Sequence, residues 1–173
     1  MNAANELIIW IVPRAEDQAR FGQVIEQLAV PRGAATFVPH ITLGAVRGDL
    51  PDIRPVLETL AGLELSPSAF GETDAFTMSL FVRFDISAPL LEARRLLEAV
   101  PGFRRGRPFD PHISLMYGSP EERDARKANL DILLNEPVVF DRLVVMQIPL
   151  PVATQEDIRK WREIDCFEIP SAA

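Results

Sequence analysis

Two near-identical pentapeptides constrain this chain more than any other feature: Pro-His-Ile-Thr-Leu at 39–43 and Pro-His-Ile-Ser-Leu at 111–115. Side chains alternate between the two faces of an extended strand, so the histidine and the hydroxyl residue share one face and the aliphatic residues the other. Proline is tolerated at the first residue of a strand. Each pentapeptide therefore predicts a β-strand with one buried apolar face and one polar face that carries an imidazole and a hydroxyl.

The pentapeptides contain the only two histidines of the protein, His40 and His112. A single histidine among aliphatic residues is more often a half-buried structural side chain than a catalytic one. Coincidence is a poor explanation when both histidines occur in the same context. We therefore take His40 with Thr42, and His112 with Ser114, as candidate catalytic residues.

Length and charge limit the classes of protein that fit. The 173 residues are 47% hydrophobic and 25% charged, which predicts one globular domain spanning 1–173 with a substantial core. The net charge of −7 argues against long nucleic acid as a ligand, because such binding needs a basic surface that neutralises phosphates. A short nucleotide remains compatible, since a locally basic pocket can lie on an acidic protein.

The single cysteine, Cys166, excludes an intramolecular disulfide framework and fits a reducing compartment. The apolar run at 7–12 is too short for a membrane span and is not preceded by the basic region of a signal peptide. We expect a cytoplasmic monomer without a membrane partner.

Hydrophobic periodicity predicts an α+β fold of largely antiparallel sheets with outer helices. A helix, a motif strand and a second helix follow one another twice, which suggests an internal duplication. Strands are expected at 7–12, 36–46, 63–70, 75–85, 138–148 and 161–169 and at the second pentapeptide, with a turn at 149–154; helices are expected at 14–30, after Asp52, after Ser87, and from a capping box at 119–122 to about 134.

Two imidazoles and two hydroxyls that converge in a cleft suit a phosphodiester substrate. One imidazole can accept a proton from water while the other protonates the leaving oxygen. The hydroxyls can hold the anionic oxygens. A metal site made of His40, His112 and Asp110 is a weaker alternative, because isolated strand histidines lack the clustered spacing of metal ligands.

The pentapeptides resemble the two His-x-Thr/Ser signatures of the two-histidine (2H) phosphoesterase superfamily. Stretches at 7–13, 37–40, 111–118 and 141–143 are similar to its cyclic phosphodiesterase branch, known from plants and yeast. The resemblance implies a two-lobed α+β fold with pseudo-twofold symmetry and a central cleft. It also implies hydrolysis of a nucleoside 2′,3′-cyclic or ADP-ribose 1″,2″-cyclic phosphate to a monophosphate, with no metal or cofactor.

By motif position, the resemblance gives catalytic roles to His40, Thr42, His112 and Ser114, with His112 as base and His40 as acid. It also places Tyr117 near the substrate. Strict alternation would put Tyr117 on the face opposite His112, so a bulge or the end of the strand must redirect it.

The loop at 103–110 carries Arg104, Arg105 and Arg107, which either form a solvated surface or bind a second phosphate or the ribose of a nucleotide. Trp10 and Phe81 either stack on a base or belong to the core.

Two other functions remain open. The first is RNA 2′,3′-cyclic phosphodiesterase or ligase-like end processing, which the acidic charge disfavours. The second is a nucleotide-binding module without turnover, which the intact histidines and hydroxyls disfavour.

Overall fold

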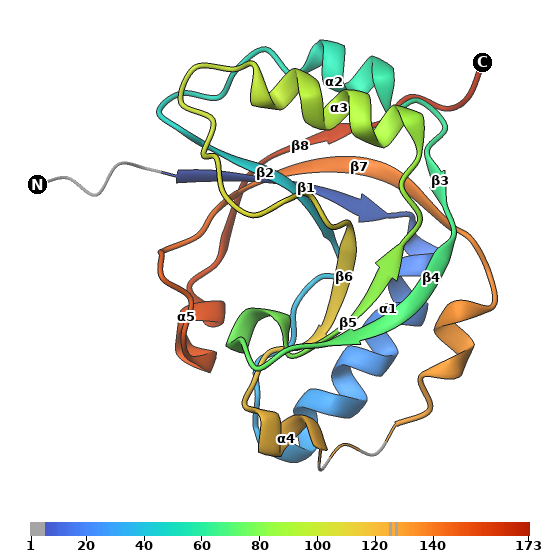
Figure 1. The fold of residues 1–173 in the computed structure, drawn as a ribbon, viewed down its shortest axis with the longest axis vertical. Helices are drawn as coiled ribbons and strands as arrows, with labels where there is room; N and C mark the ends of the chain where they lie inside the picture. Colours follow the sequence, from blue (N-terminus) through green and yellow to red (C-terminus); the bar gives the residue numbers. More distant parts are fainter. Residues whose placement is uncertain (1–5, 125, 127) are drawn as a thin grey trace, which may run out of the picture.

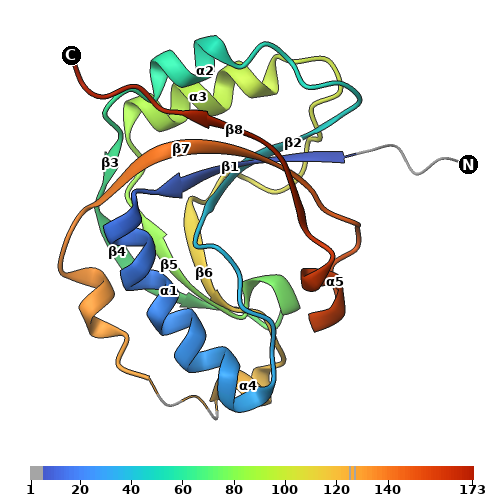
Figure 2. The ribbon, with the colours of Figure 1, turned by 180° about the vertical axis from the view of Figure 1, so that it is seen from behind.

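The computed structural model describes residues 6–124, 126 and 128–173. Two antiparallel β-sheets with helices packed outside them form the structure (Figures 1 and 2), which confirms the predicted α+β class. The larger sheet runs in the order β2 (Ile41–Arg47), β1 (Glu6–Pro13), β7 (Val138–Gln147) and β3 (Glu64–Leu65), with β8 (Arg162–Glu168) also paired to β7; the smaller sheet consists of β4 (Pro67–Glu72), β5 (Leu80–Phe84) and β6 (His112–Met116).

Helices connect and cover the two sheets. α1 (Ala15–Ala29) follows β1 and packs against β6, whereas α3 (Ala88–Glu98) follows β5 and packs against β2 and α2 (Arg54–Thr59). Each sheet is thus covered by a helix whose preceding strand belongs to the other sheet. Short helices α4 (Pro120–Asp124) and α5 (Gln155–Arg159) and 3₁₀ turns at Val30–Arg32, Phe76–Met78 and Asp131–Leu134 complete the elements.

The two motif strands meet although they belong to different sheets. β2 contains the first pentapeptide from Ile41 onward, β6 begins at His112, and β2 and β6 are in contact. Their apolar faces point into one core cluster that draws on both sheets: Ile41, Leu43, Ile113 and Leu115 are 0% exposed. The predicted alternation of the pentapeptides is therefore confirmed on the apolar side.

Local sequence signals explain several helix starts. The Ser87 hydroxyl accepts a hydrogen bond from the Leu90 N–H, and Ser119 and Glu122 form the reciprocal contacts of a capping box. The Asp52 carboxylate accepts from the Arg54 N–H just before α2, where the capping position itself is Ile53. These three starts were predictable because each depends on side chains within four residues of the helix.

The predicted limits of one strand and one helix were wrong. The strand expected at 75–85 is a strand only from Leu80, because Phe76–Met78 forms a 3₁₀ turn closed by the Thr73 hydroxyl on the Met78 carbonyl. The fourth helix ends at Asp124 instead of near 134, and a new 3₁₀ turn starts at Asp131, whose N–H is accepted by the Asn129 side chain.

The turn expected at 149–154 is present, and it leads into a helix, α5, that the sequence did not predict. A capping box between Thr154 and Asp157 starts α5. The single-domain organisation and the pseudo-twofold relation between the halves stay predictions. None of the helices in the described part of the chain has the length and apolar character that crossing a membrane requires.

Candidate active site

The two histidines are held by the same backbone contact. The His40 Nδ1 lies 2.6 Å from the Val38 carbonyl oxygen, and the His112 Nδ1 lies 2.7 Å from the Asp110 carbonyl oxygen. A carbonyl oxygen can only accept, so Nδ1 is the donor in both rings. In each case Nε2 is left as the nitrogen that can take up or release a proton.

His40 is the more buried of the two histidines, with 6% of its surface exposed. Its ring stacks on the Trp10 indole at 3.5 Å between centroids and 12° between planes, and the Trp161 ring meets its edge at 6.2 Å. Burial lowers the pKa of His40 to about 4, partly opposed by the hydrogen bond to Val38 and reinforced by the nearby His112. His40 is therefore neutral at pH 7, and electrostatic interaction with His112 contributes to its lowered pKa.

His112 is the first residue of β6 and is half-buried. It packs against the Phe81 ring at 4.9 Å and pairs in register with Arg83 of β5. The Arg83 guanidinium makes two hydrogen bonds, at 2.8 and 2.9 Å, to the carboxylate of Asp110, and holds the pKa of that carboxyl below its usual range. The Asp110 carboxylate is thus engaged by an arginine beside the histidine.

The two hydroxyls differ in their surroundings. Ser114 is buried, its Oγ donates to the Thr77 carbonyl at 3.4 Å, and its side chain is hydrogen-bonded to that of Tyr117. Thr42 is exposed and lies opposite Trp10, where a register shift interrupts the pairing of β1 with β2. The Thr42 side chain is thus exposed to solvent, whereas the Ser114 hydroxyl is buried and hydrogen-bonded.

Tyr117 directly follows β6, which ends at Met116. The end of the strand therefore accounts for its turn toward Ser114, which strict alternation would have prevented. Its ring packs against Phe37 at 4.4 Å and Trp161 at 5.5 Å, and burial raises the pKa of its hydroxyl. Tyr117 is therefore a protonated side chain beside the Ser114 hydroxyl.

Trp161 connects the two motifs and was not among the predicted site residues. It touches His40 on one side and Tyr117 on the other, so ring contacts and one hydrogen bond join His40 to Ser114. Gln155 of α5 fixes this region, because its side chain accepts from the Ala35 N–H and donates to the Tyr117 carbonyl. The capping box at 154–157 was the sequence signal for α5. The contacts of Trp161 are with residues distant in the sequence, so no local pattern predicts them.

The residues expected to stack on a base are buried. Trp10 is 3% exposed and presents a face to His40, and Phe81 is 1% exposed and packs against His112. Trp10 and Phe81 are therefore core residues, the second of the two alternatives left open by the sequence, and each packs against one of the histidines.

The arginine loop is attached to the first motif strand. The Arg104 N–H donates to the Ala45 carbonyl at 2.8 Å, and Phe103 forms a bridge to Val46 of β2. Of the three arginines, Arg104 and Arg107 line a cavity of about 1090 Å³ next to the motif strands, whereas Arg105 is exposed and does not contribute to its lining.

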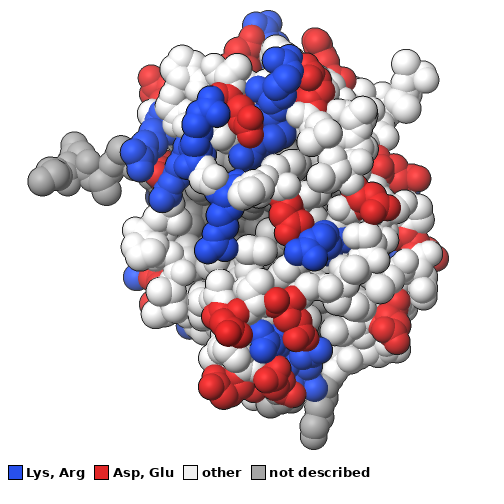
Figure 3. Space-filling view, viewed as in Figure 1, with Lys and Arg blue, Asp and Glu red and all other residues white. Residues whose placement is uncertain are grey.

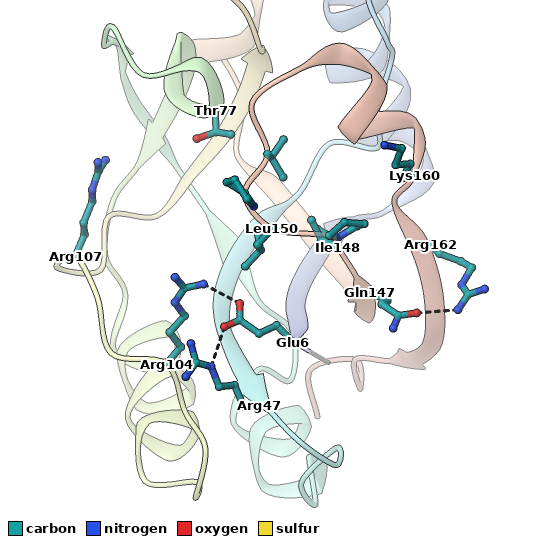
Figure 4. A pocket seen from close by; sticks show the side chains of 13 residues that line it. Glu6, Arg47, Thr77, Arg104, Arg107, Gln147, Ile148, Leu150, Lys160 and Arg162 are labelled. Carbon is teal, nitrogen blue, oxygen red and sulfur yellow. Dashed lines mark hydrogen bonds and ion pairs between the residues drawn. The ribbon is translucent and has the colours of Figure 1, made fainter. Parts of the chain in front are cut away.

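The residues that line this cavity do not include His40 or His112, and ten of them are labelled in Figure 4. Ile148, which lines it, belongs to the core cluster that contains Trp10, and Val152, which also lines it, packs against that cluster. Thr77, whose carbonyl accepts the Ser114 hydrogen bond, is a further lining residue. Within the described residues, no three histidine, cysteine, aspartate or glutamate side chains are grouped so that they could hold a metal ion.

Solved structures show what this chain is similar to. E. coli LigT in complex with 3′-AMP has 16% sequence identity over 96% of this chain and 98% of its own, with a TM-score of 0.53. LigT in complex with NADP⁺ has 15% identity over 96% and 98%, with a TM-score of 0.52. A further crystal structure of a phosphoesterase has 15% identity over 97% and 99%, with a TM-score of 0.53.

The chain therefore has the LigT fold over nearly its whole length, and identities this low show the fold alone. The likeness expected from the pentapeptides is confirmed at the level of the fold, which the chain shares with LigT and a phosphoesterase. No protein-family model and no curated protein sequence matches the chain.

Proposed function

We propose that this protein is a metal-independent cyclic phosphodiesterase of the two-histidine superfamily. Its substrate is a nucleoside 2′,3′-cyclic or an ADP-ribose 1″,2″-cyclic phosphate, which it hydrolyses to a monophosphate. The observation that carries the proposal is the matched pair of histidines: each donates Nδ1 to the carbonyl two residues earlier, on motif strands that contact each other. The fold shared with a phosphoesterase and with LigT, whose complexes contain 3′-AMP, NADP⁺ and ATP, supports a nucleotide substrate.

The reaction needs one imidazole that accepts a proton and one that donates it. Water attacks phosphorus as its proton passes to the base, one of the two ester P–O bonds breaks, and the acid protonates the ribose oxygen that leaves. The hydroxyls of Thr42 and Ser114 hold the non-bridging oxygens, where negative charge accumulates. Tyr117, hydrogen-bonded to Ser114, positions that hydroxyl.

Burial favours His40 as the base. A ring stacked on Trp10 and kept neutral at pH 7 is ready to accept a proton at Nε2, and the half-exposed His112 is left with the role of the acid. This assignment is the reverse of the one that the family resemblance implies. It follows from the indole beside His40, since the backbone contacts of the two rings are the same.

The test is turnover of 2′,3′-cyclic AMP and of ADP-ribose 1″,2″-cyclic phosphate, followed by ³¹P NMR, for the wild type and for His40→Gln and His112→Gln. Each substitution should lower kcat by roughly 10²- to 10⁴-fold, the usual contribution of a general acid or base. Thr59→Ala, at a partly exposed threonine of α2 outside the candidate site, serves as the control and should match the wild type. Chelation with EDTA should leave the rates unchanged. Near-normal turnover by either folded histidine variant, verified by circular dichroism, would refute the proposal.

A further inference from the structure

We propose that the cavity beside the motif strands is a binding subsite for a second phosphate, so that the preferred substrate carries at least one phosphate beyond the one that is hydrolysed. The inference rests on the proposed function and specifies its substrate class. The second phosphate belongs either to the pyrophosphate of an ADP-ribose derivative or to the next phosphodiester of an RNA end.

The charge of the cavity is opposite to that of the protein. A chain of net charge −7 surrounds this cavity with five cationic side chains and a single carboxylate, Glu6. Figure 3 shows lysine and arginine side chains gathered in the upper left of one face, above a hollowed area. The cations are Arg47, Arg104, Arg107, Lys160 and Arg162. Such a local excess of positive charge concentrates anions.

Two of the five cations are already paired. Glu6, whose side chain is 9% exposed, binds Arg47 at 3.0 Å and Arg104 at 2.7 Å. This pairing attaches the arginine loop to the first residue of β1, beside the last residue of β2. Arg47 and Arg104 therefore build the wall of the cavity, with Glu6 cancelling part of their charge.

The charges of the other three cations are not neutralised by a short salt bridge among the described residues. The Arg107 guanidinium donates a long hydrogen bond to the Met78 sulfur, at 3.9 Å. Arg162 donates to the neutral Gln147 side chain at 2.7 Å, and Lys160 has a long ion pair of 3.9 Å with Asp157. No ion pair engages Arg107 or Arg162 within the part of the chain that the structure covers. These side chains can therefore bind an anion without first breaking a short salt bridge.

The three cations stand on opposite walls. Arg107 comes from the loop after α3, whereas Lys160 and Arg162 come from the end of α5 and the start of β8 (Figure 4). Ile148 and Leu150 lie between the two walls. A phosphate bound in the cavity can receive a bidentate guanidinium contact from one wall, while the cations of the other wall add to the attraction.

The cavity adjoins the candidate active site at both motifs. Thr77 lines it, and its carbonyl accepts the Ser114 hydrogen bond. Val152 also lines it and packs against the core cluster that contains Trp10, the residue stacked on His40. A substrate whose cyclic phosphate lies at the histidines can therefore extend its remaining phosphates into the cavity.

The experiment compares kcat/KM for three substrates: 2′,3′-cyclic AMP, which has no second phosphate, ADP-ribose 1″,2″-cyclic phosphate, and a diadenylate ending in a 2′,3′-cyclic phosphate. The double variant Arg107→Gln/Arg162→Gln removes one cation from each wall. Arg54→Gln/Arg95→Gln is the control, with the same loss of charge at exposed arginines paired to Asp52 and Glu92.

The wild type should prefer a substrate with a second phosphate. The cavity variant should lose roughly 10- to 100-fold in kcat/KM on that substrate, the value of one or two charged hydrogen bonds, and stay unchanged on cyclic AMP. The control should behave as the wild type. Preference for the ADP-ribose derivative identifies a pyrophosphate, and preference for the diadenylate a phosphodiester. Equal losses on all substrates, or no preference in the wild type, would overturn the inference.

Failure of the proposed function is distinguishable from failure of the subsite. If the wild type hydrolyses none of the three compounds, the proposed function fails, and calorimetric titration with ADP-ribose then decides on the subsite. Binding that is lost in Arg107→Gln/Arg162→Gln and kept in Arg54→Gln/Arg95→Gln supports the subsite. Equal binding by both variants, or none by the wild type, rejects it.

Discussion

His40 and His112 follow proline in nearly the same pentapeptide and make the same backbone contact, yet only His40 lies against an indole. The stacked ring comes from Trp10 of β1, placed beside the first motif by the register shift between β1 and β2. No pattern within either pentapeptide contains this difference. The candidate site residues therefore come from the repeated motif, while the lowered pKa of His40 depends on a neighbouring strand that the motif does not contain.

The assignment of His40 as the base predicts the acidic limb of the pH profile. The pKa of His40 is lowered to about 4, so the residue is neutral above that pH and becomes a cation as the pH falls through it. In the wild type, kcat/KM for cyclic AMP should hold as the pH is lowered below the usual imidazole range and fall only as the pH approaches about 4. If His40 were the acid, the same parameter would instead decline as the pH rises above that value. A buffer series, with circular dichroism at each pH to verify folding, decides between the two roles.

At the scale of elements, the structure depends on connections that local periodicity does not encode. The residues at 75–85 alternate as a strand should, but β4 pairs with β5 only as far as Glu72 and Leu80, and the hydroxyl of Thr73 closes the chain into a 3₁₀ turn beyond that point. By contrast, Ser87 was identified as a cap because the donor it satisfies lies three residues away. Helix starts that depend on side chains within one turn were predictable from the sequence. The ends of strands, which depend on pairing with another strand, were not.

Gly102, between α3 and the arginine loop, adopts a backbone conformation that can be tested by substitution. Gly102 has φ of 86°, its carbonyl accepts from the Arg47 N–H at 2.9 Å, and an added Cβ would meet the Arg47 carbonyl oxygen. Gly102→Ala should therefore lower the free energy of unfolding by about 1–3 kcal/mol, measured by urea denaturation.

Gly106→Ala is the matched control for this substitution. Gly106 lies in the same loop, has nothing within 4 Å of an added Cβ, and does not adopt a positive φ. It should be close to neutral. Equal stability of the two variants would show that the close backbone contact between Arg47 and Gly102 does not hold the loop in place.

At the scale of the whole molecule, the distribution of charge limits the size of the substrate. The net charge is −7, and the cations that line the cavity lie within one region of an otherwise acidic chain. Figure 3 shows acidic side chains on the same face, below and to the right of the hollowed area. Charges are screened within about 8 Å at physiological salt, so the cavity attracts a phosphate inside it and does little for one that lies farther along a strand.

This distribution predicts that binding gains from one distal phosphate and not from many. Among RNAs that end in a 2′,3′-cyclic phosphate, kcat/KM should rise from the mononucleotide to the dinucleotide and then stay level up to a dodecamer. Each additional phosphate would meet solvent or acidic surface instead of a basic track, which gripping a strand requires. The steady-state rates of the length series at physiological salt provide the measurement, and Arg54→Gln/Arg95→Gln controls for nonspecific loss of charge. A continued rise with length would show that the strand is held well beyond the cavity, and the protein would then act on long RNA despite its negative charge.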